Sequence, residues 1–276
     1  GQHYLNVPSD PGDVFNLSGQ SFTFEGWFQH NASVTPDGFG HIIGGSRNAG
    51  GFGGYLLKME ADGSIQGYFR DNTNGAATFS IQTSGTDFRS DTVFHHFALV
   101  WQDGAGTNST GYAEIYIDGI LEASGSAPSS FSAADADAGD QAFIIGGRNA
   151  ATQNTWDGRF DEFRFSDVAL ASSEFLSAPP ASSTVAYWQF DSNGSSSGLT
   201  DSVGTYDLVV AEGTGFAANS TASINPVPNP DMTVGFAGNP SANPDPGLSH
   251  ASLSLPGGSG QHYLNVPSDP GDVFNL

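Results

Sequence analysis

The chain of 276 residues carries 29 acidic side chains against 7 basic ones, which gives a formal net charge of −22. Such a surface repels nucleic-acid phosphates and anionic lipids and favours divalent cations, so we expect no nucleic-acid partner and no membrane insertion. Cysteine is absent, which excludes disulfides, thiolate metal sites and cysteine nucleophiles. With 37% hydrophobic residues and 21 Phe, the composition predicts a folded domain, and a single all-β core can reach this length.

One stretch of 17 residues occurs twice, as residues 1–17 and again as residues 260–276, at an offset of 259 residues. An unchanged repeat of this length indicates that the chain is a window on a periodic sequence. The glycine-rich residues 257–260 leave an engineered flexible linker as an alternative origin of the second copy.

The front of the chain is rich in strand patterns. In residues 21–29, three Phe alternate with Thr, Glu and Trp, which is typical of a strand in a half-buried sheet. An Asp-Gly turn separates residues 54–60 from residues 65–70 and predicts a hairpin between them. Two further strands are expected, at residues 39–45 and 78–82.

The next strand, residues 93–102, is apolar on both faces, with Phe97, Leu99 and Trp101 on one of them. A strand buried on both faces belongs in the middle of a sheet. After a glycine-rich turn, residues 112–117 run back and end at an Asp-Gly turn.

From here the sequence resembles a known family. HFALVW at residues 96–101, followed by EIYIDGIL at residues 114–121, resembles the central hairpin of the laminin G-like, concanavalin A-like family, to which the pentraxins are related. Residues 143–148 and 156–165 are similar to that family's last strands, and residues 166–176 are similar to the short helix that follows them. The resemblance implies an all-β fold, a two-sheet antiparallel jelly-roll sandwich.

The pattern of the closing strand is irregular. Its apolar period slips between Phe160 and Phe163, which predicts a β-bulge that re-aims Asp161. For the short helix we expect an N-cap at Ser172 or Ser173.

The last third of the chain resembles the opening strands of the same family, out of their usual order. We therefore predict a circular offset: residues 1–178 hold the central and closing strands, residues 179–183 form a linker, and residues 184–276 hold opening strands, with a Pro- and Asn-rich insertion at 224–247. The opening strands either fold back onto the same chain as a permutant or complete the next repeat. We expect the second of these.

The second copy of the repeated segment is predicted to contact a neighbouring unit, because the first copy already fills its place. The expected contact residues are Gly260, Gln261, His262, Tyr263, Leu264, Val266, Val273, Phe274 and Leu276.

Two groups of carboxylates are candidate calcium ligands. Asp135, Asp137 and Asp140 share one loop, although their spacing differs from the EF-hand and a solvated acidic loop is an equal alternative. Asp157 and Asp161 form the second group, for which the resemblance implies a rim calcium and for which turn formation or capping is the alternative.

Other candidate sites favour a structural role. His95 and His96 have no further zinc ligands nearby in sequence, so we expect them to be packed and hydrogen-bonded. Glu60 and Asp62 match the start of a β-glucanase acidic motif, but no second glutamate follows, so we expect no enzyme activity.

These patterns lead to two hypotheses about function. The first is a structural subunit of an extracellular filament or giant surface adhesin, a head-to-tail homopolymer of laminin G-like repeats. The alternative is a calcium-dependent carbohydrate-binding, lectin-like module of a secreted or surface protein. Both hypotheses place the protein outside the cell or on its surface, and the lack of cysteine favours a bacterial origin, because extracellular domains without disulfides are commonplace in bacteria.

Overall fold

The computed structural model of the protein describes a series of segments separated by gaps. They are residues 3–8, 14–15, 17, 19–36, 38–47, 54–71, 78–90, 93–105, 110–131, 143–147, 154–176, 182–190, 200–212, 215–218, 226–228 and 251–255. Among these residues, no helix has the length and hydropathy needed to cross a bilayer.

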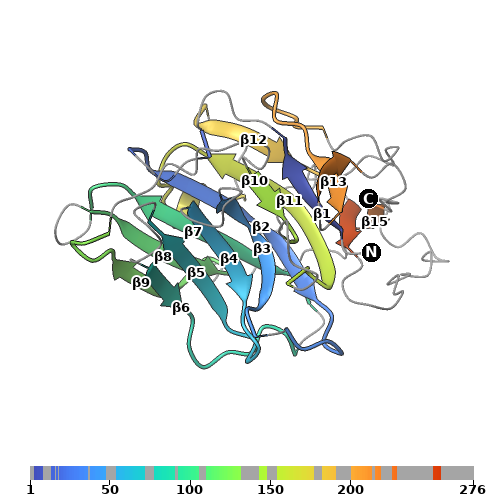
Figure 1. Cartoon of the computed structure of the whole chain (residues 1–276), viewed down its shortest axis with the longest axis horizontal. Helices are drawn as coiled ribbons and strands as arrows, with labels where there is room; N and C mark the ends of the chain where they lie inside the picture. Colours follow the sequence, from blue (N-terminus) through green and yellow to red (C-terminus); the bar gives the residue numbers. More distant parts are fainter. Residues whose placement is uncertain are drawn as a thin grey trace.

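The described strands form two antiparallel β-sheets that pack face to face (Figure 1). Sheet A has the order β14 (Gly215–Ala218), β13 (Val209–Glu212), β1 (His3–Val7), β10 (Phe143–Ile145), β3 (His41–Arg47), β4 (Gly54–Met59), β5 (Ile65–Arg70) and β6 (Thr78–Gln82). Sheet B has the order β15 (Pro226–Pro228), β16 (Ala251–Leu255), β11 (Gly158–Ser166), β2 (Phe22–His30), β7 (His95–Gln102), β8 (Tyr112–Ile117) and β9 (Ile120–Ser126), and β12 (Thr184–Trp188) also pairs with β11. The predicted all-β jelly-roll sandwich is confirmed.

The core lies between the sheets and is largely aromatic. The three Phe of β2 and the Phe97, Leu99 and Trp101 side chains of β7 all face it, as their alternation predicts. On the opposite face of β7, Ala98 and Val100 are buried as well. β7 therefore has the two buried faces and the central position that its sequence predicts.

Two strands have no clear pattern in the sequence. β1 is buried on both faces, because Leu5 and Val7 enter the central core while Tyr4 packs in a separate cluster on the outer face of sheet A. β9 is the end strand of sheet B among the described residues, and its side chains are half-buried or exposed. Neither burial pattern alternates cleanly, so the period-two signal is lost.

The predicted bulge in β11 is confirmed. The register of β11 against β2 shifts between Asp161 and Arg164, and Glu162 within this step has a positive φ of 52°. The extra residue returns Phe163 to the core, where its ring covers Gly26 so closely that a Cβ there would lie 2.1 Å from it. Only glycine fits opposite the bulge.

The predicted short helix is a single 3-10 turn, Ser172–Glu174. Its expected serine cap is wrong, because Ala171 stands at the N-cap and the Glu174 carboxylate accepts the Ala171 N–H at 2.9 Å. One turn is too short to need further capping.

Strands from beyond residue 184 pair with strands from the front of the same chain. β12 pairs with β11, and β13 pairs with β1, which Figure 1 shows as an orange strand beside the dark blue one. In a single chain, these opening strands fold back as a permutant. Their assignment to a neighbouring unit concerns an assembly of several units and stays a prediction.

Candidate functional site: the seam between the ends of the sandwich

The first copy of the repeated segment forms an interior strand and two core anchors. β1 lies between β13 and β10, with Leu5 opposite Val210 on one side and Ile145 on the other. Phe15 and Leu17, at the end of the repeat, are both completely buried. A segment with neighbours on both sides and buried anchors fills a closed position in the sheet, which we call the β1 slot.

Aromatic rings join this segment to the rest of the core. The Phe15 ring centroid lies 5.0 Å from that of Phe143, 4.9 Å from Phe165 and 5.0 Å from Tyr206. Trp188 of β12 stacks on Phe143 at 5.7 Å. Removing either the front segment or the opening strands would open the same part of the core.

Residues 184–190 and 200–208, which we call the clasp, are tied together by their own hydrogen bonds. The Asp201 carboxylate accepts backbone N–H groups from Tyr187 at 2.9 Å, Val203 at 3.0 Å and Tyr206 at 3.1 Å. The Trp188 indole N–H donates to the Tyr206 carbonyl at 2.8 Å. One buried carboxylate thus organises both arms of the clasp.

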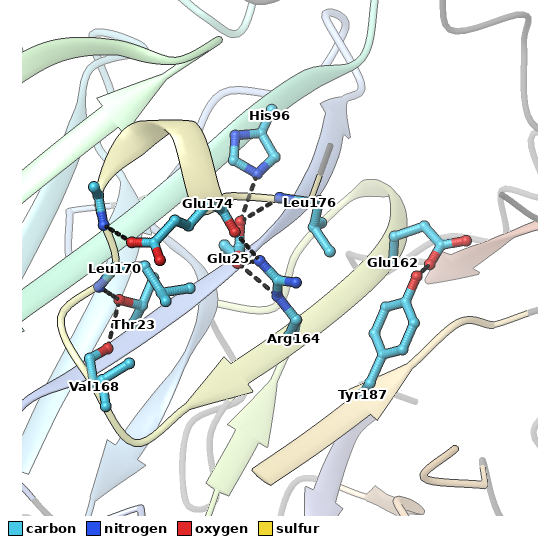
Figure 2. Close-up of polar contacts among 11 residues, drawn as sticks. Thr23, Glu25, His96, Glu162, Arg164, Val168, Leu170, Glu174, Leu176 and Tyr187 are labelled. Carbon is cyan, nitrogen blue, oxygen red and sulfur yellow. Dashed lines mark hydrogen bonds and ion pairs between the residues drawn. The ribbon is translucent and has the colours of Figure 1, made fainter. Parts of the chain in front are cut away.

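The clasp docks on β11 just beyond the bulge. Backbone pairing runs from Phe163 opposite Trp188 to Ser166 opposite Thr184. The Tyr187 hydroxyl donates a hydrogen bond to the Glu162 carboxylate, as Figure 2 shows. Burial, followed by the nearby Glu162 charge, raises the pKa of Tyr187 above its ordinary value, so the hydroxyl keeps the proton that it donates.

A second segment, residues 167–176, covers the outer face of sheet B, and we call it the strap. The Thr23 hydroxyl donates to the Val168 carbonyl and accepts the Leu170 N–H, both at 2.8 Å. The Leu176 N–H donates to Glu25 Oε2 at 2.9 Å. These side chains of β2 hold both ends of the strap (Figure 2).

Beneath the strap lies a buried charged cluster. Arg164 Nε donates to Glu25 Oε1 at 2.7 Å, and His96 Nε2 lies 3.1 Å from Glu25 Oε2. Arg164 also donates to the Glu174 carbonyl at 2.7 Å. Because Glu25, His96 and Arg164 are at most 1% exposed, this cluster anchors the strap and does not face a solute.

The structure describes two of the predicted calcium ligands. Asp157 is buried, and its carboxylate accepts the Asn31 side-chain amide at 3.2 Å, while Asp161 is buried on β11 opposite Trp27. The described part of the chain contains no group of three or more potential ligands that could hold a metal. Asp135, Asp137 and Asp140 lie outside the described residues, so the calcium site stays a prediction.

The nine predicted inter-unit residues, from Gly260 to Leu276, also lie outside the described residues. Their first-copy counterparts can be located by subtracting 259. Those of Tyr263, Leu264, Val266, Phe274 and Leu276 are all buried, namely Tyr4, Leu5, Val7, Phe15 and Leu17.

The two adjacent histidines have the predicted structural role. His95 Nδ1 lies 2.7 Å from the Asp118 carboxylate, and His96 belongs to the charged cluster under the strap. Of the β-glucanase-like pair, Glu60 forms an ion pair with Lys58, and Asp62 accepts the Ser64 hydroxyl at 2.5 Å. Hydrogen bonds from Ser64 lower the pKa of Asp62.

Sequence reasoning missed the residues that hold the strap and the clasp: Glu25, Glu162, Arg164, Tyr187 and Asp201. One signal was available for two of them. Arg164 stands between two Phe, and Glu25 follows Phe24, in strands that carry large apolar side chains. A charged side chain in that setting indicates a buried pair.

Comparison with known proteins agrees with this architecture. A family model described as the concanavalin A-like lectin/glucanases superfamily matches residues 1–175. Among solved structures, a candidate carbohydrate-binding protein from Bacteroides ovatus has a TM-score of 0.55 and 18% identity, over 77% of this chain and 56% of that one. The present chain thus spans little more than half the length of that protein.

Two other solved structures are more distant. The CBM40 of the Ruminococcus gnavus IT-sialidase has a TM-score of 0.46 and 15% identity, over 63% of this chain and 91% of that one. Domains LG4-5 of the mouse laminin alpha1 chain have a TM-score of 0.43 and 14% identity, over 63% of this chain and 41% of that one. No curated protein matches the sequence. The family match covers more than half of the chain and coincides with the observed sandwich, so the chain belongs to the concanavalin A-like lectin/glucanases superfamily, with a laminin G-like fold.

Proposed function

We propose that the chain is a structural unit of an extracellular filament or giant surface adhesin, in which laminin G-like units follow one another head to tail. One observation carries the proposal: the 17 residues that fill the β1 slot occur a second time at residues 260–276. The high negative charge suits a soluble surface protein.

Each sandwich has a single β1 slot, and the first copy fills it between β13 and β10. An identical second copy has the same preference for such a slot, so it fits best in another unit. Insertion by strand addition gives a contact that repeats along an axis and produces a filament unless it closes into a ring.

The duplication supplies its own matched control. Leu264→Asp places a charge in the second copy, and Leu5→Asp places the same charge in the first, where Leu5 is 1% exposed. We expect Leu264→Asp to retain the folded sandwich and to abolish association, measured by light scattering and negative-stain microscopy of the full chain. Leu5→Asp is expected to unfold the sandwich. Unchanged association in Leu264→Asp would overturn the proposal.

Carbohydrate binding is the second candidate function. It is favoured by family membership and by the similar fold of the candidate carbohydrate-binding protein from Bacteroides ovatus. The two functions are compatible, because an adhesin can bind glycans through each of its units. Retention of the full chain on a glycan array supports this function, and failure to bind any glycan with or without calcium would remove it.

Calcium at Asp135, Asp137 and Asp140 belongs to this second candidate. Three carboxylates within six residues that include a glycine supply the oxygen ligands that calcium prefers. We expect calcium to raise the melting temperature and EDTA to reverse the effect, and Asp137→Asn to weaken it. No heat of binding in calorimetry would contradict the site. We expect no hydrolysis of polysaccharides.

A further inference from the structure

The clasp and the strap differ in how their backbone groups are satisfied, and the clasp is the more self-contained of the two. Its backbone N–H groups at Tyr187, Val203 and Tyr206 all donate to Asp201 within the clasp itself. Ser202 N–H further donates to the Tyr187 carbonyl at 2.9 Å. These N–H groups would therefore keep their hydrogen-bond acceptors if the clasp left its sandwich.

Resting on the proposed assembly of units, we infer that the clasp is a preassembled insert that a sandwich accepts from a second copy of this chain as well as from its own. The docking partner is the edge of β11 beyond the bulge, and the hydrogen bond from Tyr187 to Glu162 sets the register. This interface adjoins the β1 slot, because β13 follows the clasp directly and pairs with β1.

Every contact that the clasp makes with β11 is available in an identical acceptor. The bonds lost on leaving are the four-residue ladder from Phe163 to Ser166, the Tyr187–Glu162 hydrogen bond and, because β13 follows Leu208 directly, the pairing of β13 with β1. Trp188 leaves the rings of Phe143 and Phe15. A second copy restores all of these contacts, so the exchange changes little except the chain entropy.

Each sandwich needs one clasp, and each chain contains one. Without it, the core loses the completely buried Trp188 and Leu208 side chains, and β11 is left with an unpaired edge beyond the bulge. An uncovered core face and an open strand edge favour binding of another clasp. The number of clasps therefore equals the number of acceptor sandwiches both in closed monomers and in exchanged assemblies, and the protein concentration determines which form is populated.

The balance can be estimated from effective concentration. A clasp tethered by a short linker has an effective concentration of about 1 mM for its own sandwich. Refolding at about 0.1 mM chain therefore places about one clasp in ten in another chain. Dilute refolding at about 1 µM leaves almost all chains closed.

The absence of cysteine makes this exchange directly measurable. Ser166 and Thr184 are paired across β11 and β12, both are buried, and neither hydroxyl makes a hydrogen bond. Full-length Ser166→Cys and Thr184→Cys chains would be unfolded together, refolded at about 0.1 mM and oxidised, then separated without reducing agent. We expect a disulfide-linked heterodimer containing about one tenth of the chains.

Three controls fix the interpretation. Ser166→Cys mixed with Ser182→Cys, an exposed residue outside the pairing, reports random oxidation and is expected to give less than a tenth of that heterodimer. The double variant Ser166→Cys with Thr184→Cys, refolded at about 1 µM, is expected to form its disulfide within one chain. When unmodified chain is added as a competitor, a Thr184→Cys chain that also carries Tyr187→Phe is expected to give a severalfold lower heterodimer yield than Thr184→Cys alone.

The outcomes separate this inference from the proposed function. Heterodimer that also forms when both chains carry Leu264→Asp supports clasp exchange independently of the second repeat copy. If the full chain associates but the Ser166→Cys and Thr184→Cys mixture yields no more heterodimer than the Ser182→Cys control, the inference is overturned and the β1-slot proposal stands.

Discussion

The strap and the clasp both cover β11, yet they are held by different kinds of interaction. The strap is fixed by charged groups that belong to other strands, with Glu25 and Arg164 reaching its backbone from below. The clasp satisfies its own backbone through Asp201 and meets β11 through a ladder, apolar rings and one side-chain hydrogen bond. The strap depends on its own sandwich for these bonds, whereas the clasp keeps its internal bonds wherever it docks, which is why we propose exchange for the clasp alone.

The largest effect is expected under the strap. Glu25→Ala leaves the Arg164 guanidinium buried without its carboxylate, which costs about 3–5 kcal/mol of the free energy of unfolding. Urea denaturation measures this loss. Replacing both Glu25 and Arg164 by Met removes the charges together and is expected to cost much less. A loss below about 1 kcal/mol in Glu25→Ala would contradict a charge-anchored strap.

In the clasp, the corresponding substitution is Asp201→Ala. It deprives three backbone N–H groups of their acceptor, and we expect a loss of about 2 kcal/mol. Asp201→Asn retains one carbonyl oxygen and is expected to fall between this variant and the parent. The comparison with the strap would fail if Asp201→Ala left the urea midpoint unchanged.

A pH effect is expected at a buried histidine pair, His30 and His41, whose Nε2 and Nδ1 atoms lie 3.0 Å apart. Burial, and then the His41 charge, lower the pKa of His30 from 6.5 to about 3. Between these values the unfolded chain binds a proton that the folded chain does not, so stability falls as pH falls.

The size of this pH effect follows from the shift. At about 1.4 kcal/mol per pH unit below 6.5, we expect the free energy of unfolding to be about 2 kcal/mol lower at pH 5 than at pH 7. Urea titrations at both pH values measure the difference. His30→Gln should flatten the profile, and a slope that persists in this variant would assign the sensitivity to other groups.

The smallest effect is expected at the Tyr187–Glu162 hydrogen bond between clasp and β11. Tyr187→Phe leaves Glu162 without that donor and is expected to cost about 1 kcal/mol. Tyr116→Phe is the matched control, since the Tyr116 hydroxyl donates to Glu114 at 3.2 Å at a part-buried site. Thermal melting of both variants compares them, and equal shifts would argue against a special role for Tyr187.

Much of the fold could be predicted because its signals are local. The alternating Phe of β2, the two-sided burial of β7 and the slipped period at Phe160 and Phe163 are visible within single strands. The strap is different, because Glu25 and Arg164 are 139 residues apart and only the paired sheet brings them together. A contact between distant positions leaves no periodic trace in one sequence.

The β1 slot and the clasp were predictable only in part, for a similar reason. The unchanged repeat identifies the segment that matters, but its burial depends on β13 and β10, which come from the far end and the middle of the chain. Asp201 looks like any turn-forming aspartate until Tyr187, Val203 and Tyr206 are seen around it.

The short connection between the strap and the clasp limits the shape of any assembly. Only residues 177–183 separate Leu176 from Thr184, and a fully extended chain of that length spans about 25–30 Å. That reach is close to the width of a small domain, so two successive sandwiches would have to touch rather than swing apart. A polymer of this chain is therefore expected to resist bending, with its rigidity set by the length of this seven-residue connection.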